Sequence, residues 1–286
     1  MQVWFFSLFF LFTVICNDTW AQEKRPDIPI QITPQVNHWI KVFQKNKKSY
    51  FNTWLLRSEK KLPKIKALLK KRQMPTDLAY LPLIESGLNP KAISSAQAVG
   101  YWQFIRPTAE SYGLEINWWL DERHDLIKST WAAAQYLERL HELFDDWYLA
   151  LSAYNMGETR LRRLIKKHGT RNFWILSKKR GFPKETRDYV PKFLATALIV
   201  KNPVYYGFQD PVNVKRQAYS YQFVPGGTDL YELSRKFDIS TNLLKELNPE
   251  LKRYYVPKTV RSHRIRVPKD FRTKVALYLS KESERF

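Results

Sequence analysis

The spacing of apolar side chains between residues 35 and 201 limits the possible folds of this chain more than any other feature. From 35 to 72 they recur at the interval of a helix, with lysines on the opposite faces. Further helices, each bounded by Gly, Pro or a polar capping residue, are expected at 107–112, 126–144, 146–156, 158–168 and 184–201. No stretch before residue 210 alternates as a strand does, so this part of the chain is predicted to be all α.

The pattern changes after Pro203. A short β-like run is followed by the turn Gly226-Gly227, by two helical patterns and by a closing strand, "HRIRVP". This β-α-α-β order is complete within residues 217–270. A small, separate α+β module is therefore expected to follow the mainly α part.

The N-terminal residues contain a short apolar run, from Val3 to Cys16, that is followed by "TWA" at 19–21. The run is too short for a comfortable membrane span, and small residues stand where a signal peptidase reads them. We expect a cleaved export signal, although no Lys or Arg precedes the run. A lipid-anchored form would use Cys16, but Ile15 is large where a small residue is expected. The mature protein is thus expected in the periplasm or at the cell wall, without a transmembrane anchor.

The chain divides into segments of different composition. Residues 22–34 are polar and contain three prolines, which is typical of a tether. A chain of 286 residues can bury one good core and add a second small module, and we expect a monomer. The predicted segments are a signal peptide at 1–21, a tether and helical extension at 22–72, a main helical domain at 73–208, the module at 217–270 and a tail at 271–286.

Positive charge dominates the sequence, with a formal net charge of +21. Between Lys41 and Arg72 there are twelve Lys or Arg residues and one acid, Glu59, and a second basic cluster extends from Arg160 to Arg187. Such surfaces bind polyanions by long-range attraction and release of counterions. For an exported protein these are acidic wall polymer, anionic lipid or nucleic acid. A solvated surface without a partner is the alternative.

The stretch "LAYLPLIESGLNPKA" ends an apolar helix on a single carboxylate, Glu85, after which Gly87 and Pro90 break the helix. A carboxylate at the rim of a core is partly desolvated, which raises its pKa and keeps it protonated near neutral pH. Such an acid can donate a proton in catalysis. From this stretch alone, a capping or salt-bridging glutamate is slightly favoured over a catalytic one.

Three further patches carry side chains that suit a sugar. "SSAQAVGYWQF" contains a glycine that allows a ligand to approach closely, followed by a tryptophan and Gln103. "LSAYNMGE" places Tyr154 and Asn155 at a helix end, and "FPKETRDYVPKF" places Glu185 and Tyr189 four residues apart on one helix face. Amide and hydroxyl groups bind sugar hydroxyls, and aromatic rings cover apolar sugar faces. Taken singly, each patch fits an ordinary core equally well.

In this order and at these distances, "ES" with "NP", "GYWQF", "AYNMGE" and "PKETRDYVPK" resemble the lytic transglycosylases with a goose-lysozyme-like fold, in the branch of the membrane-bound lytic murein transglycosylase D. The resemblance covers about residues 40–205. The module resembles a divergent LysM domain through "GGTDLYELSRKFDIS", "LNPEL" and "RIRVP". The implied fold is mainly α, with a lysozyme-like helical catalytic domain and a small βααβ LysM-like module.

The resemblance also implies roles for single residues. Glu85 would be the only acid/base: it would protonate the β-1,4 glycosidic oxygen between N-acetylmuramic acid and N-acetylglucosamine and then deprotonate the 6-hydroxyl that closes a 1,6-anhydro ring. Most glycosidases use two carboxylates instead. Tyr189 would lie beside Glu85, and Glu185 would help to arrange its helix. Sugar or acetamido groups would be held by Ser94, Gln103, Tyr154 and Asn155.

The sequence departs from the family pattern at one position, and two rival functions are compatible with it. Gln97 stands where the family often has glycine, which leaves substrate preference open. A lysozyme of the same fold would hydrolyse the bond, possibly in deacetylated peptidoglycan, with help from a second carboxylate. Candidates for that carboxylate are Asp121, Glu122, Asp125, Asp145, Asp146 and Glu158. The other rival is a non-catalytic protein that binds wall polymer or another polyanion.

Other chemistries find less support in the sequence. "HELFD" lacks the second histidine of a zinc protease helix, and no nucleophile elbow or phosphate-binding glycine loop occurs. Nucleic-acid motifs are also absent from the sequence. We therefore expect peptidoglycan glycan strands as the partner, no nucleic acid, no metal and no cofactor.

Overall fold

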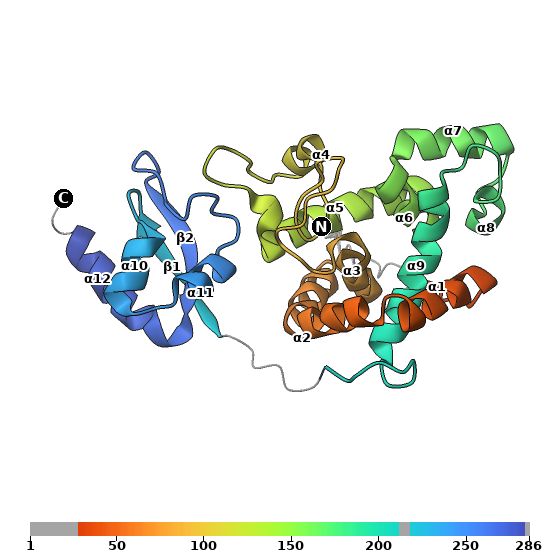
Figure 1. The fold of residues 1–286 in the computed structure, drawn as a ribbon. Helices are drawn as coiled ribbons and strands as arrows, with labels where there is room; N and C mark the ends of the chain where they lie inside the picture. Colours follow the sequence, from red (N-terminus) through yellow and green to blue (C-terminus); the bar gives the residue numbers. More distant parts are fainter. Residues whose placement is uncertain (1–27, 212–217, 284–286) are drawn as a thin grey trace, which may run out of the picture.

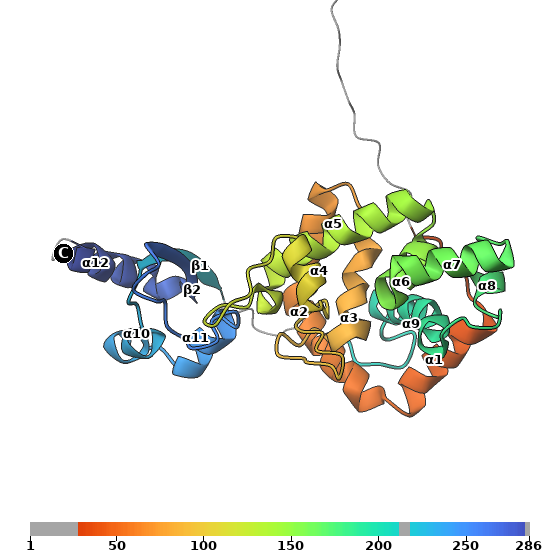
Figure 2. The same cartoon turned by 90° about the horizontal axis from the view of Figure 1, so that it is seen from above.

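The computed structural model describes residues 28–211 and 218–283. A helical body forms one end of the molecule and a small module the other, as Figures 1 and 2 show. The predicted signal peptide and residues 22–27 of the predicted tether lie outside the described residues. Within the described ranges, no helix is both long and apolar enough to cross a bilayer.

Two N-terminal helices support the body, α1 (Pro34–Lys45) and α2 (Lys48–Lys71). Thr33 caps α1 by accepting a hydrogen bond from the Val36 N–H at 3.3 Å. α2 buries residues such as Phe51 and Trp54 on one face and leaves most of its lysines exposed on the other. This amphipathic pattern is the one expected from the sequence.

A short buried helix, α3 (Leu81–Ser86), follows the 3₁₀ turn η1 (Thr76–Tyr80). Gly87 ends α3 with a φ of +60°, a value that favours glycine. A Cβ at Gly87 would lie 2.3 Å from Nε1 of Trp54, so α2 and the end of α3 are in close contact. α3 also packs against α9 (Lys184–Lys201).

Four of the remaining helices of the body agree closely with the predicted ranges, whereas a short 3₁₀ turn at 122–124 and a short helix at 173–176 were not predicted. These elements are α4 (Arg106–Ser111), η2 (Glu122–His124), α5 (Leu126–Phe144), α6 (Trp147–Met156), α7 (Glu158–His168) and α8 (Phe173–Leu176). Asp125 and Asp146 cap α5 and α6 by accepting hydrogen bonds from backbone N–H groups of the first turn. Among the described residues no β-strand precedes Tyr219, so the all-α prediction for the body is confirmed.

The module has the predicted β-α-α-β order, with β1 (Tyr219–Pro225), α10 (Leu230–Phe237), α11 (Thr241–Leu247) and β2 (Ser262–Pro268). The two strands pair antiparallel, with Gln222 opposite Ile265. Beyond β2, the turn η3 (Lys269–Phe271) leads into α12 (Arg272–Ser283). Val275 and Leu279, four residues apart on α12, are buried in the core of the module. Residues 272–283 of the predicted tail therefore form a helix that packs against β1.

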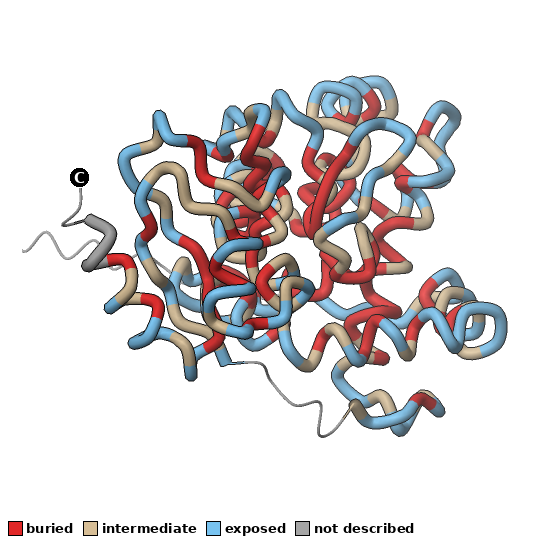
Figure 3. The backbone as a smooth tube through the Cα atoms, turned by 60° about the vertical axis from the view of Figure 1, so that its left-hand side comes forward, coloured by how far each residue is buried: buried red, intermediate tan, exposed pale blue. Residues whose placement is uncertain are grey.

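Buried residues form two cores, and Figure 3 marks the buried positions along the backbone. The larger core fills the helical body and includes α3, α5, α6 and α9. The smaller core fills the module, and it also takes in Trp119 and Leu120 from the loop between α4 and α5. The module therefore packs directly on the body as well as being joined to it by the chain.

Candidate active site

Glu85 lies at the end of α3, where the buried part of the helix meets the surface. Leu81 to Ile84 are buried, whereas Glu85 is partly exposed. The Tyr189 hydroxyl, from α9, donates a hydrogen bond to Oε1 of Glu85. Lys192, one turn further along α9, donates from Nζ to the Ile84 carbonyl oxygen at 3.4 Å. The carboxylate thus has a phenol and an ammonium group on the same neighbouring helix.

The surroundings of Glu85 change its acidity. Burial raises the pKa of the Glu85 carboxyl to about 7, against the hydrogen bond from Tyr189 and the charge of Lys192, which both lower it. The charge of Glu185 adds a smaller upward effect. Near neutral pH a substantial fraction of Glu85 is therefore protonated and able to donate a proton.

The segment 92–104 forms a compact loop beside α3. Isolated β-bridges join Val99 to Ile93 and to Phe104, and the Ser94 hydroxyl oxygen accepts a hydrogen bond from the Ala98 N–H at 3.0 Å. Gln103 has a φ of +50°. Its Nε2 donates to the carbonyl oxygens of Ala92 and Gly100 at 3.2 and 3.0 Å, so the amide nitrogen holds the loop together.

Hydroxyl groups from two helices hold this loop against the body. The Ser86 hydroxyl donates to the Tyr101 carbonyl oxygen at 2.8 Å, and the Tyr154 hydroxyl donates to the Trp102 carbonyl oxygen at 2.7 Å. Trp102 is completely buried, and its indole N–H donates to Oγ1 of Thr130 at 3.1 Å. Trp102 is therefore a core residue, and it offers no surface for a sugar to stack on.

Gly100 is needed for a reason that differs from the expected one. Its φ is +82°, and a Cβ there would lie 2.0 Å from the Arg123 carbonyl oxygen. The close approach that the sequence suggested for a ligand is made in the structure by the backbone of Arg123. Gln97 occupies a position at which the family often has glycine, and its φ is +59°. Glycine adopts that conformation more readily than glutamine.

Asn155 and Glu185 meet at the junction of α6 and α9. Nδ2 of Asn155 donates to Oε1 of Glu185 at 3.3 Å, and the Thr186 hydroxyl donates to Oδ1 of Asn155 at 2.6 Å. Tyr154 precedes Asn155 on α6, and burial raises the pKa of its phenol with a further contribution from Glu85. The structure thus brings Tyr154 and Tyr189 to Glu85, keeps Ser94 and Gln103 in the adjacent loop, and places Asn155 with Glu185 at the start of α9.

Comparison with known proteins identifies the two parts of the chain. Residues 63–177 match the family described as Transglycosylase SLT domain, and residues 223–284 match the LysM-like domain of the lytic transglycosylase MltD. The chain carries a transglycosylase SLT domain. Together with the observed element order, these matches confirm the predicted fold class, a lysozyme-like helical domain with a small LysM-like module.

A curated relative shows the same similarity over a longer range. The chain is 37% identical over 210 residues to the membrane-bound lytic murein transglycosylase D of Escherichia coli K12, a match that covers 72% of this chain and 46% of the relative. The chain thus spans about half the length of the curated relative it matches.

Two solved structures are also similar. An inactive variant of the lytic transglycosylase Slt from Pseudomonas aeruginosa has a TM-score of 0.41 and 23% identity, covering 53% of this chain and 25% of that one. The 70 kDa soluble lytic transglycosylase of Escherichia coli has a TM-score of 0.44 and 16% identity, covering 67% and 40%.

Three basic residues near Glu85 were not predicted from the sequence. Lys192 lies three residues after Tyr189, a spacing that places both on one helix face and could have indicated it. Arg57 and Lys61, from α2, donate to the carbonyl oxygens of Gly87 and Leu88, each at 3.0 Å. No local pattern could have revealed these two contacts, because α2 and the end of α3 are brought together only by the fold.

Five of the six carboxylates considered for a hydrolytic reaction have other partners in the SLT domain. Asp121 is paired with Arg123 at 2.7 Å, and Glu158 is paired with Arg139. Asp125 and Asp146 are helix caps, and Glu122 accepts a hydrogen bond from Lys128. Asp145 follows the last turn of α5 with a φ of +45°. Within the described residues, Glu185 is the carboxylate whose charge acts on Glu85.

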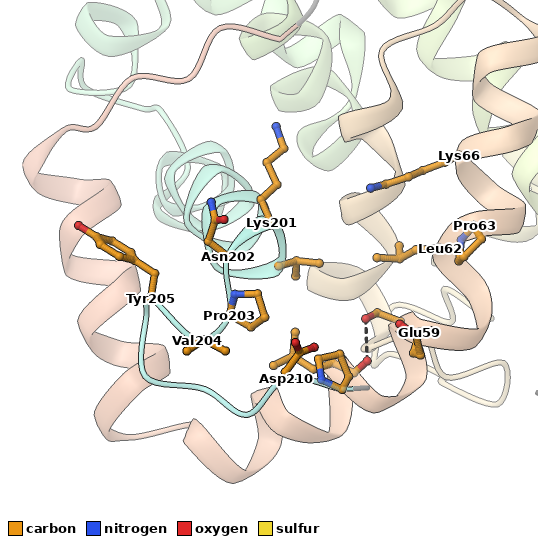
Figure 4. A pocket seen from close by; sticks show the side chains of 14 residues that line it. Glu59, Leu62, Pro63, Lys66, Lys201, Asn202, Pro203, Val204, Tyr205 and Asp210 are labelled. Atoms are coloured by element: carbon orange, nitrogen blue, oxygen red, sulfur yellow. Dashed lines mark hydrogen bonds between the residues drawn. The ribbon is translucent and has the colours of Figure 1, made fainter. Parts of the chain in front are cut away.

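A separate cavity of about 680 Å³ lies between α2 and the segment after α9 (Figure 4). Its cations already have partners: Lys201 is paired with Asp77 at 2.6 Å, and Lys66 donates to the Tyr80 hydroxyl at 2.9 Å. None of the predicted site residues, all of which lie in the described part of the chain, lines this cavity. The candidate active site is therefore the surroundings of Glu85.

Proposed function

We propose that this protein cleaves the β-1,4 bond between N-acetylmuramic acid and N-acetylglucosamine in peptidoglycan, without adding water. The observation that carries the proposal is a single, partly buried carboxyl at the end of α3, Glu85, whose pKa is raised to about 7. The SLT domain and its similarity to a lytic murein transglycosylase support the choice of substrate.

In the proposed reaction, protonated Glu85 gives its proton to the glycosidic oxygen as the bond from that oxygen to the anomeric carbon breaks. The resulting carboxylate then takes the proton of the muramic 6-hydroxyl, whose oxygen bonds to the anomeric carbon and closes a 1,6-anhydro ring. Glu85 ends the cycle protonated, and no water is consumed. The hydrogen bond from Tyr189 stabilises the carboxylate between the two steps, since it favours the charged form.

Sugar binding is assigned to the surroundings of Glu85. Gln103 has its amide nitrogen bound within the loop, so we assign its amide oxygen to a sugar hydroxyl or acetamido N–H. Ser94 and Asn155 would contribute further hydrogen bonds. Tyr154 and Glu185 would act by holding the loop and the start of α9, because their polar atoms bond to Trp102 and to Asn155.

The basic surface and the LysM-like module would hold the enzyme on its polymer. Exposed cations on α7, at the end of the molecule far from the module (Figures 1 and 2), are Arg160, Arg162, Arg163, Lys166 and Lys167. Peptide carboxylates of the wall would be attracted to this face, and two linked weak contacts prolong binding to a repeating polymer. We further propose an exported, monomeric protein that acts in the periplasm or at the wall, with the segments 22–72, 73–208, 217–270 and 271–286 as its parts.

Release of soluble fragments from purified peptidoglycan tests the assignment of Glu85. Glu85→Gln keeps the shape of the side chain and removes its proton chemistry, so we expect release to fall by about 10²-fold or more. Glu110→Gln, a matched change of an exposed glutamate on α4, should leave release unchanged. Equal release by Glu85→Gln and the unmodified protein would exclude Glu85 as the acid/base.

A further inference from the structure

The loop that connects α4 to α5 is shared between the SLT domain and the LysM-like module. The Asp121 N–H donates to the Glu250 carbonyl oxygen at 2.9 Å, and the Lys252 N–H donates to the Trp119 carbonyl oxygen at 2.8 Å. Leu120 and Leu251 form an antiparallel β-bridge. The chain of the SLT domain therefore pairs with the backbone of the module, in the manner of an added short strand.

A buried cation of the module strengthens this contact. Arg266, on β2, donates from Nη1 to Oε1 of Glu250 at 2.8 Å and from Nη2 to Oδ2 of Asp125. Arg266 and both carboxylates are buried. The other oxygen of Asp125 caps α5, since it accepts from the N–H groups of Ile127 and Lys128 at 2.7 and 2.8 Å. One carboxylate thus joins the start of a catalytic-domain helix to a strand of the module.

The opposite side of the same segment supports the 92–104 loop. Arg123 donates from Nη1 to the Phe104 carbonyl oxygen at 3.1 Å, and its own carbonyl oxygen occupies the space beside Gly100. His124 donates from Nδ1 to the Pro90 carbonyl oxygen. The side chain of Arg123 is fixed in turn by Asp121 at 3.0 and 2.7 Å. Residues 121–125 therefore lie between the module and the loop that is placed beside Glu85.

We propose that the LysM-like module positions the active-site loop 92–104, through Arg266 and the segment 115–125. The expected effect on catalysis rests on the proposed function. The structural link between the module and the loop rests only on the contacts on both sides of the segment. Arg266 is a positioning residue: it acts on Asp125, which begins α5, and α5 carries the Thr130 hydroxyl that holds Trp102. The module then contributes to turnover even on a substrate too short to reach it.

Amide hydrogen exchange of the full chain tests the structural part without any substrate. The informative amides are those of Val99, Gly100 and Phe104, which donate to carbonyl oxygens within the loop. In Arg266→Met we expect exchange of these amides to be faster by about tenfold or more, because the loop loses its support. Arg264→Met is the matched control, since Arg264 is exposed on the same strand and lies over the Tyr221 ring at 4.2 Å from its centroid. Equal protection of the loop in both variants would overturn the proposal.

Kinetics on a short soluble glycan test the catalytic part. We expect Arg266→Met to lower kcat by about tenfold to a hundredfold, with KM changed by less than about twofold, because a displaced loop disturbs the reacting geometry more than the affinity. Arg266→Lys keeps the charge and should recover part of kcat, whereas Arg264→Met should match the unmodified protein. An unchanged kcat in Arg266→Met would contradict a positioning role.

Two controls keep the outcomes distinct. If the unmodified protein cleaves no glycan, the proposed function fails, while hydrogen exchange still decides whether the module supports the loop. If Arg266→Met does not fold, Lys252→Ala replaces it, since this exposed side chain donates to the Asn117 carbonyl oxygen at 2.9 Å across the same contact. A smaller loss of loop protection would support the proposal, and full protection would overturn it.

Discussion

The Tyr189 hydroxyl donates a hydrogen bond to the carboxylate of Glu85, although the two residues lie 104 positions apart in the sequence. This bond joins the end of the short helix α3 to the second turn of α9. Burial raises the pKa of Glu85, and the bond from Tyr189 limits the rise. The acidity of the proposed catalytic group is therefore set mainly by desolvation, which raises its pKa, and by the Tyr189 phenol and the charge of Lys192, which lower it.

Removing the phenol should shift the pH dependence of the reaction. Glu85 has to be protonated to donate, so kcat/KM on a soluble glycan is expected to fall as the pH rises past its pKa of about 7. Tyr189→Phe removes a bond that lowers this pKa, and the alkaline limb should move to higher pH by roughly one unit. Tyr50→Phe, at an exposed tyrosine, should leave the profile unchanged. A limb that moves to lower pH in Tyr189→Phe would contradict this balance.

Neutralising Glu85 should stabilise the protein above pH 7. The pKa of Glu85 is raised from 4.5 to about 7, so between these values the folded protein keeps a proton that the unfolded chain has released. The free energy of unfolding therefore decreases through this window as the pH rises. Relative to the unmodified protein, Glu85→Gln should gain about 1 to 3 kcal/mol between pH 4 and pH 8. Denaturant unfolding at the two pH values measures this gain, and no gain would show that burial does not raise the pKa.

Adding a methyl group at Gly87 should destabilise the end of α3. Gly87 has a φ of +60°, and a Cβ would meet the Trp54 indole. Gly87→Ala is expected to cost about 2 to 4 kcal/mol, from overpacking and from the left-handed backbone together. Gly113→Ala is the matched control: Gly113 has a φ of +80° with nothing within 4 Å of the added atom, so it should cost only about 1 to 2 kcal/mol. Equal losses in denaturant unfolding would exclude a tight contact with Trp54.

Salt should weaken attachment to the wall more than it weakens turnover. The exposed cations of α7 act at long range on wall carboxylates and are screened when the Debye length falls to about 3 Å near 1 M salt. We expect pelleting with insoluble peptidoglycan to decrease strongly between low and high salt, while kcat on a short soluble glycan changes little. Equal sensitivity of the two measurements would place the charge effect in the active site instead.

Local features of the fold could be predicted from the sequence. The helix expected at 126–144 is found at Leu126–Phe144, because its cap and apolar spacing lie within the segment itself. The grouping of Tyr189 with Glu85 was expected only through resemblance to a family. Contacts between distant segments could not be predicted, since periodicity does not say which elements meet.

Gly100 and Arg266 illustrate this limit. The neighbour that requires a glycine at position 100 is the backbone of Arg123, and one of the two carboxylate partners of Arg266 is Asp125, 141 positions away. Both are consequences of tertiary packing. The sequence left open whether Trp102 is a core residue or a sugar-binding residue. Its complete burial, with its indole N–H bonded to Thr130, shows that it is a core residue.

In the proposed reaction Glu85 transfers protons and no water is added. Mass spectrometry of the soluble products from purified peptidoglycan distinguishes this reaction from hydrolysis. We expect fragments lighter by one water than the products of a lysozyme on the same material, and we expect these fragments to be absent with Glu85→Gln. Fully hydrated reducing ends would contradict this expectation and would make the protein a hydrolase of the same fold.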